Sequence, residues 1–234
     1  MSVAKKIVLS VGFLVVMFAA YGFYANHSSS TLNDNTVSVF KWAHVINVGS
    51  QVQALSADGR EYELMRIMAP NEAERSRAEG LMSQLTPKLN KAYEEYEQAI
   101  QEAPFPNESD RSQKIARINK LKEERKEYAD VRQRATDLMD AGDHEGAITL
   151  ALNDQSDVYK RMSDLLEEDK ADSVRLARAE MAHSEDVFSG VKTTTLIALV
   201  IVVILSVITL ILLLRSIKNS VDTILDGARH IAAG

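Results

Sequence analysis

The chain has 234 residues, of which 26% are charged and 6% aromatic, with only 10 Gly and 4 Pro. This composition favours long helices over sheets. The absence of cysteine excludes disulfides and thiolate metal sites. A formal net charge of −6 argues against nucleic acid as a partner, because phosphate binding needs a basic face.

An uncharged apolar segment covers residues 7–24 and directly follows two lysines. As a helix it is about 27 Å long, close to the thickness of the hydrocarbon core of a bilayer. The lysines keep residues 1–6 in the cytoplasm, so we predict a first transmembrane helix. A cleaved signal peptide is the alternative, with Ala20 and Gly22 as small residues of a cleavage site. We favour the anchor because the apolar run exceeds a usual signal-peptide core.

A second apolar segment, residues 193–214, is dense in Leu, Ile and Val and is followed by Arg215 and Lys218. With the N-terminus inside, a second crossing returns the chain to the cytoplasm. Basic residues then flank the inner end of both spans, as the positive-inside rule requires. Residues 25–192 are therefore predicted to lie outside, and residues 215–234 inside.

Proline, glycine and capping residues divide the external region into helices. The expected helices cover residues 32–69, 71–103, 108–141 and 154 onward through the second span, with a short piece at 144–152. The first is about 57 Å long and the external part of the last about 58 Å. Matching lengths predict an all-α, up-down-up-down four-helix bundle. Pro87 is expected to kink or break the second helix, with Thr86 as a cap.

Each helix also carries a narrow apolar stripe at helical spacing, which is buried only against other stripes. The stripes are Val37, His44, Val48, Leu55, Tyr62 and Met65; Leu81, Leu85, Leu89, Ala92, Tyr96 and Ile100; Ile118, Leu121, Tyr128, Ala135 and Met139; and Val158, Met162, Leu166, Val174, Ala177, Met181 and Phe188. Beyond the second span, Ile217, Val221, Ile224, Ala228 and Ile231 follow steps of four and three. This is a coiled-coil seam, which needs a partner helix and implies a dimer or a hairpin.

This order of span, bundle, span and relay helix resembles a methyl-accepting chemotaxis receptor over nearly the whole chain. Residues 142–147, Gly-Asp-His-Glu-Gly-Ala, resemble the Gly-Asp-x-x-x-Ala signature of the four-helix-bundle sensor family. Residues 231–234, Ile-Ala-Ala-Gly, resemble the Ile-Ala-x-Gly close of the first HAMP helix. A proline that is common early in that HAMP helix is missing from residues 217–221.

The resemblance implies a two-pass protein of the bacterial inner membrane with a periplasmic, homodimeric sensor bundle. The bundle would bind a small molecule, such as an organic acid or amino acid, or a periplasmic binding protein. A displacement of the fourth helix would then pass through the membrane to HAMP. A cytoplasmic hairpin that controls a histidine kinase with its adaptor normally follows, and no cofactor is implied.

Two arginines on the third helix form the leading candidate site. Arg125 and Arg132 lie seven residues apart at the edge of the apolar stripe, with Tyr128 between them. An arginine near a core seam needs an anionic partner, and a dicarboxylate or tricarboxylate held by the guanidinium forks would provide one. The alternative is pairing with Asp or Glu on neighbouring helices, or extension into water. Thr86 and Tyr159 are expected within side-chain reach of the same level.

The pattern Arg-x-x-Tyr-x-x-x-Arg also resembles the ligand-binding face of four-helix-bundle receptors for organic acids. A second candidate is Arg60 with Arg66, since arginines of this region clasp a ligand between subunits in some relatives. Their spacing is not distinctive, and a solvated helix face is the interpretation we favour for them.

No metal or catalytic site is expected. The histidines are His27, His44, His144, His183 and His230. His44 stands about 30 Å from the membrane and His183 about 13 Å, so they cannot share a metal. His44 is expected in the core or an interface, and Trp42 in packing. With no Cys, no phosphate-binding loop and no nucleophile elbow, the sequence indicates no enzyme.

Two other functions stay open. The same sensor could precede a histidine kinase or a diguanylate cyclase, which the sequence after Gly234 would decide. Alternatively, the bundle could be a structural membrane-anchored coiled coil without a ligand. That function predicts tight apolar packing in place of the arginine site.

Overall fold

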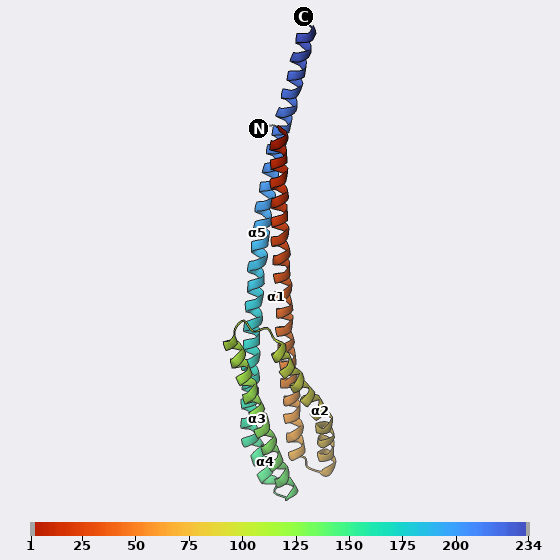
Figure 1. Cartoon of the computed structure of the whole chain (residues 1–234). Helices are drawn as coiled ribbons and strands as arrows, with labels where there is room; N and C mark the ends of the chain where they lie inside the picture. The colour runs from red at the N-terminus through yellow and green to blue at the C-terminus, as the bar shows by residue number, and fades with distance from the viewer. Residues whose placement is uncertain (1–2, 233–234) are drawn as a thin grey trace. The chain divides into compact units, whose positions relative to one another are not determined.

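The computed structural model describes residues 3–232, and all the regular structure in them is helical (Figure 1). The helices are α1 (Val3–Ile67), α2 (Glu72–Glu102), α3 (Glu108–Asp140), α4 (His144–Leu152) and α5 (Asp154–Ala232). No strand occurs among the described residues. The all-α prediction is confirmed, including the short fourth helix before the long last one.

Local side-chain chemistry explains where these helices begin. Asn71, Asn107 and Asp143 are N-caps, and each side chain accepts the backbone N–H three residues further on, at 2.9–3.0 Å. Each such bond satisfies a donor that a helix N-terminus otherwise leaves unpaired. Gly142 has φ +81°, a left-handed conformation that follows the end of α3 and suits glycine. The predicted breaks between the bundle helices are therefore confirmed.

The bundle forms one compact unit, Thr36–Met181. Contacts between neighbouring helices show that these helices are antiparallel. As the residue number increases along one helix, the number of the residue that it contacts on the next helix decreases. The pairs are Gly49–Tyr96 and Ser56–Tyr93 for α1 and α2; Asn90–Arg125 and Glu97–Lys122 for α2 and α3; and Asp110–Arg175 and Glu124–Arg161 for α3 and α5. Gln53 of α1 also donates to Glu167 of α5 at 2.7 Å, which closes the ring of four helices.

The buried core confirms the predicted stripes of α2 and α3, and the part of the α5 stripe up to Ala177. The prediction is wrong for Met181 and Phe188, which are exposed. The predicted stripe of α1 is only partly right, since Val48 is buried, Leu55 packs against the core and Tyr62 is half-buried, but its other members are exposed. Val37 is 46% exposed and Met65 40% exposed, and His44 is exposed rather than in the core. Beside Val48, the buried face carries Trp42, Val45 and Val52, which the predicted stripe left out. Trp42 decides the rotation of the helix, because it packs edge-on against Phe105 with ring centroids 5.2 Å apart.

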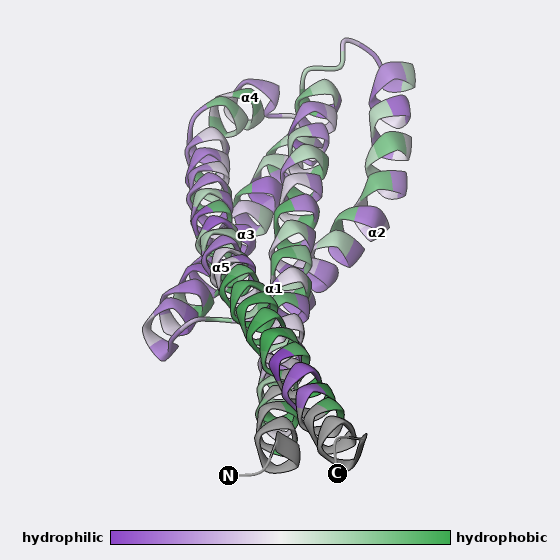
Figure 2. Ribbon diagram, turned by 90° about the horizontal axis from the view of Figure 1, so that it is seen from above, coloured by the Kyte–Doolittle hydropathy of each residue, from purple (hydrophilic) through white to green (hydrophobic). Residues whose placement is uncertain are grey.

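Two expected interruptions do not occur. α1 runs from Val3 to Ile67 without a break, so the bundle helix does not start anew near residue 32. α2 continues through Pro87 and is not broken there, although Figures 1 and 2 show it bent along its length, as the predicted kink requires. Thr86 is not a cap, because its hydroxyl donates to the Met82 carbonyl oxygen at 2.8 Å inside the helix. Proline removes only one N–H donor, and the buried side chains on both sides of it hold α2 in the bundle.

A second unit contains the N-terminal segment up to Asn35 and the C-terminal segment from Ala182. Many of its large apolar side chains are exposed, and Figure 2 shows a continuous hydrophobic stretch in α5. The helical stretch His144–Asn219 is long and apolar enough to cross a bilayer by length and composition. Tyr21 and Thr195 share a hydrogen bond of 2.7 Å between α1 and α5. The relay seam stays a prediction, since the side chains of residues 224, 228 and 231 lie outside the described set.

Candidate ligand-binding pocket in the helix bundle

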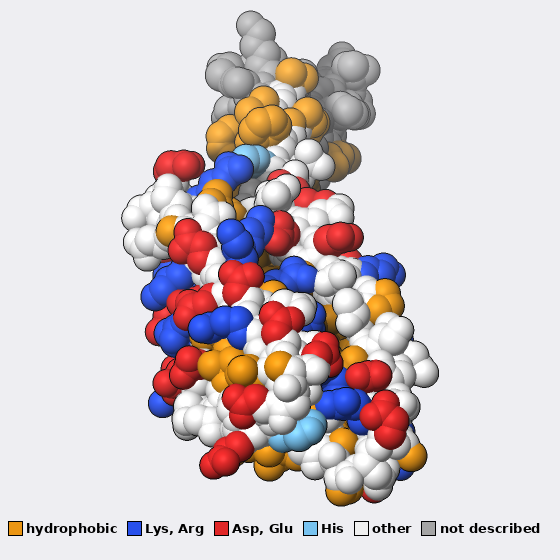
Figure 3. Space-filling model, turned by 90° about the horizontal axis from the view of Figure 1, so that it is seen from below, with side chains coloured by type: hydrophobic (Ala, Val, Ile, Leu, Met, Phe, Trp, Pro, Cys, Tyr) orange, Lys and Arg blue, Asp and Glu red, His pale blue; other side chains and the backbone are white. Residues whose placement is uncertain are grey.

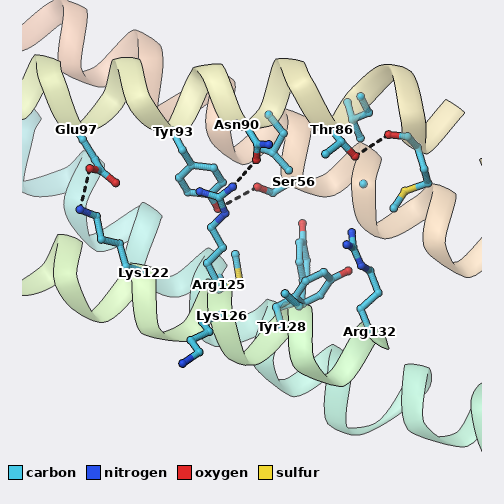
Figure 4. Close-up of a pocket in the computed structure, with 17 residues that line it drawn as sticks. Ser56, Thr86, Asn90, Tyr93, Glu97, Lys122, Arg125, Lys126, Tyr128 and Arg132 are labelled. Carbon is cyan, nitrogen blue, oxygen red and sulfur yellow. Dashed lines mark hydrogen bonds and ion pairs between the residues drawn. The ribbon is translucent and has the colours of Figure 1, made fainter. Parts of the chain in front are cut away.

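A pocket of about 440 Å³ lies within the bundle unit and is lined by side chains of α1, α2, α3 and α5 (Figure 4). The five residues of the leading sequence-based site all line it: Thr86, Arg125, Tyr128, Arg132 and Tyr159. The structure therefore brings together residues from three helices that the sequence placed at one level. Their role in binding a ligand stays a prediction.

Helical spacing explains how α3 builds one wall. Arg125, Tyr128 and Arg132 follow steps of three and four, so they project from one face of the helix. α2 supplies the opposite wall with Thr86, and with Asn90 and Tyr93 at the same kind of spacing. Figure 4 shows the α2 and α3 side chains extending toward each other across the gap. A small molecule in this gap would contact both helices.

The lining of the pocket is basic. Lys122, Arg125, Lys126 and Arg132 line it together with a single carboxylate, that of Glu97. Glu97 is already paired, with 2.7 Å between its Oε2 and the Lys122 Nζ. The remaining positive charge has no carboxylate within the pocket lining. Such a surface favours an anion, because charge-assisted hydrogen bonds to arginine are among the strongest available in a protein.

The two arginines differ in what they contact. The Arg125 guanidinium lies over the Tyr93 ring, 4.1 Å from its centroid, and donates to Asn90 Oδ1 at 2.5 Å. Within residues 3–232, neither arginine has a carboxylate within 4.0 Å, so the alternative of pairing with neighbouring acids is wrong for both. Extension into water stays the other alternative, since both side chains are half-buried. Figure 4 shows the Arg132 guanidinium reaching toward Thr86. Arg132 is thus poised toward the gap without an acidic partner of its own.

Tyr128 combines a buried hydroxyl with a contact to a second ring. Its centroid lies 6.5 Å from that of Tyr159. Its Oη is buried and has no hydrogen-bond partner among the described residues. Burial raises the pKa of Tyr128 to about 12, although the nearby Arg60 guanidinium acts in the opposite direction. An unpaired buried hydroxyl costs stability, which a binding site can tolerate when a ligand supplies the missing partner.

We therefore expect Tyr128→Phe to raise the free energy of unfolding without ligand by about 1 kcal/mol, because the unpaired hydroxyl is removed while the ring stays. Chemical denaturation followed by circular dichroism measures this change. Tyr159→Phe is the matched control, since its ring is only half buried, and it should stay within about 0.5 kcal/mol of the parent. A loss of stability in Tyr128→Phe would contradict the prediction.

The same pair of variants gives a pH test. The pKa of Tyr128 in the folded state is about 12, above the ordinary value of 10.0. Between these two pH values the folded chain holds a proton that the unfolded chain has lost, so stability falls as pH rises. Tyr128→Phe should lose less stability than the parent in this interval.

The second sequence-based candidates, Arg60 and Arg66, do not line this pocket, although Ser56 and Gly59 of α1 do. The expectation of a solvated face is wrong for Arg60, which is only 9% exposed. Its Nη2 donates to the Ala151 carbonyl oxygen at 2.5 Å. Arg66 is half-buried and bonds Glu63 at 2.8 Å and Thr136 at 2.6 Å. A ligand clasp between two subunits stays a prediction that nothing here tests.

Several lining residues were missed by the sequence reasoning. Asn90 and Tyr93 are four and seven residues after Thr86, so the face of α2 already chosen could have pointed to them. Leu89 and Met162 belong to the predicted stripes, but nothing in a stripe separates a pocket wall from a closed core. Among the described residues there is no group of three His, Asp or Glu side chains that could hold a metal ion.

Comparison with known proteins shows that one protein family matches most of the chain. The family described as "Four helix bundle sensory module for signal transduction" matches residues 1–188. The match therefore includes α1 to α4, the first part of α5 and every residue that lines the pocket. No match was found among curated proteins or among solved structures.

Proposed function

The chain belongs to the four-helix-bundle sensory modules of methyl-accepting chemotaxis proteins, and from that premise we propose that its pocket binds a small organic anion. Ligand binding would displace α5, and the displacement would pass through the second apolar segment to the first HAMP helix. The observation that carries this proposal is Arg132, a guanidinium at the pocket with no acidic partner among the described residues. The family is sensory rather than catalytic.

We propose a two-pass topology, with residues 7–24 and 193–214 in the bacterial inner membrane and residues 25–192 in the periplasm. Support comes from the exposed apolar side chains of both segments, such as Phe18, Phe23, Leu199 and Leu210, which need a nonpolar solvent. The bundle surface is different, because Figure 3 shows acidic and basic side chains interspersed over the face it presents. A homodimer is part of the proposal, and the exposed Val37 and Phe40 on α1 suit such a contact.

Two alternatives lead to different observations. A periplasmic binding protein could be the partner in place of a free small molecule, and then no small molecule would change the stability of the bundle. The same sensor could also control a histidine kinase or a diguanylate cyclase in place of a chemotaxis hairpin. A ligand-free structural anchor is disfavoured by the basic pocket, since an anchor gains nothing from arginines without acidic partners.

The test of the proposed site is a melting experiment on the full chain in lipid nanodiscs. At one hundred times its dissociation constant, a ligand adds about 2.7 kcal/mol to the free energy of unfolding. For a bundle of this size that amounts to a rise in Tm of several degrees, about 2–4 °C for each kcal/mol. We expect one member of a panel of organic acids and amino acids to give such a rise at fixed pH.

Arg132→Ala should abolish this rise, because the charge that holds the anion is removed. Arg134→Ala is the matched control: Arg134 is exposed on the same helix and does not line the pocket. The proposal fails if no compound raises Tm, or if the rise is the same in Arg132→Ala as in the parent.

A further inference from the structure

We propose that the ligand is a monoanion with an apolar, ring-sized body, such as an aromatic or alicyclic carboxylate, and not a dicarboxylate or tricarboxylate. This inference rests on the proposed function and names the ligand class of the same pocket. It departs from the expectation drawn from the sequence, in which both arginines hold carboxylates.

The first step concerns which cations are available to a ligand. Lys122 is paired with Glu97, and Lys126 points away from the gap in Figure 4. One face of the Arg125 guanidinium is covered by the Tyr93 ring at 4.1 Å, and its Nη2 is bound to Asn90. Among the described side chains, Arg132 has no aromatic ring stacked on its guanidinium and no hydrogen-bond acceptor or carboxylate bound to it. Arg132 is therefore the lining guanidinium without a side-chain partner in residues 3–232, and its fork can hold one carboxylate with two parallel hydrogen bonds.

The second step concerns the apolar part of the pocket wall. Met82, Leu85, Leu89 and Met162 line the pocket, together with the ring of Tyr128. A second carboxylate placed against these apolar side chains, away from Ser56, Thr86 and Asn90, would lose its water without gaining a partner, which is very costly. An apolar body at the same place gains free energy from the surface that it buries. The walls therefore select against a second charge.

The third step concerns the shape of that body. Tyr128 and Tyr159 meet at an interplanar angle of 56°, with their centroids 6.5 Å apart. Aromatic rings pack favourably on such tilted pairs, edge to face. The pocket volume of about 440 Å³ is at the lower end of ligand pockets and suits a compact molecule. A single ring that carries one carboxylate meets all three conditions.

The experiment compares four probes on the full chain in lipid nanodiscs by isothermal titration calorimetry. The probes are benzoate, cyclohexanecarboxylate, succinate and citrate. We expect benzoate and cyclohexanecarboxylate to bind at least about tenfold more tightly than succinate and citrate, a difference of about 1.4 kcal/mol. Arg132→Gln should weaken benzoate binding by about tenfold or more, whereas Arg134→Gln should leave it unchanged.

Leu89→Gln tests the apolar wall of the pocket. This variant should weaken the binding of benzoate but not the binding of succinate. Its Tm without ligand shows whether the variant is folded. If succinate or citrate binds more tightly than benzoate and needs Arg132, the ligand class is overturned while the proposed function stands. If none of the four probes binds, the ligand class is overturned, and the wider panel of the melting experiment still tests the function. Benzoate binding that is unchanged in Arg132→Gln would overturn the placement of the carboxylate.

Discussion

Asp169→Ala should lower the free energy of unfolding by about 3–5 kcal/mol, because it leaves a buried ammonium without its counter-ion. Lys114 is 0% exposed, and its Nζ lies 2.9 Å from Asp169 Oδ2. The same Nζ donates to the Asp169 carbonyl oxygen and to Ser173 Oγ, while the Tyr96 hydroxyl donates to the Asp169 carboxylate. The substitution thus removes the carboxylate that the buried Lys114 and Tyr96 share, and with it a contact of Arg117 at 3.3 Å.

Chemical denaturation followed by circular dichroism measures this loss. Asp172→Ala is the matched control, since Asp172 is less buried and pairs with Arg117 and Arg175 near the surface. Its cost should stay within about 1 kcal/mol, as for other partly exposed ion pairs. A cost of less than about 1 kcal/mol for Asp169→Ala would show that Lys114 finds water or another acceptor.

The pH dependence of the variant gives an independent check. Burial lowers the pKa of Lys114 below its ordinary value of 10.5, and the charge of Asp169 counteracts this effect. Without Asp169, the pKa in the folded state should fall further. Between this lowered pKa and 10.5 the unfolded chain binds more protons than the folded one, so stability should rise with pH. Asp169→Ala should therefore recover part of its lost stability as the pH approaches 10.5.

The boundaries of the helices were predictable because the chemistry that ends a helix is local. Asn71, Asn107 and Asp143 cap the helices that follow them, and Gly142 supplies the left-handed residue after α3. The buried face of α1 was not predictable in this way. That helix has apolar side chains on two faces, and its buried face is set by partners distant in sequence, such as Phe105 against Trp42.

The candidate site was likewise predictable only where it depends on the spacing of residues within one helix. The three α3 residues of the pocket share one helical face, which their spacing already showed. The partners that distinguish Arg125 from Arg132 come from α2, and pairing across helices has no signature in a single sequence. Lys114 was missed for the same reason. It stands in a helix rich in charge, and its partner Asp169 is 55 residues away.

Trp42→Ala should cost about 3–5 kcal/mol of the free energy of unfolding, the range for large aromatic side chains removed from a packed core. Trp42 is 0% exposed and contacts Phe105 edge-on. Because it is the only tryptophan in the chain, circular dichroism must replace fluorescence as the measurement. Trp42→Phe should cost less, since a ring remains in the core and the indole N–H, which has no partner among the described residues, is removed.

The Trp42→Phe variant also tests whether the indole only packs in the core or also takes part in ligand binding. Trp42 does not line the pocket, so a folded Trp42→Phe should keep the Tm rise produced by a ligand that Arg132→Ala abolishes. A lost ligand response in Trp42→Phe would instead assign the indole a part in recognition. The Lys114 ammonium lies 5.7 Å from the centroid of the indole, close enough for a cation–π interaction. A double-mutant cycle of Trp42→Leu with Lys114→Met should therefore show a coupling of about 0.5–2 kcal/mol, whereas independent sites would add without coupling.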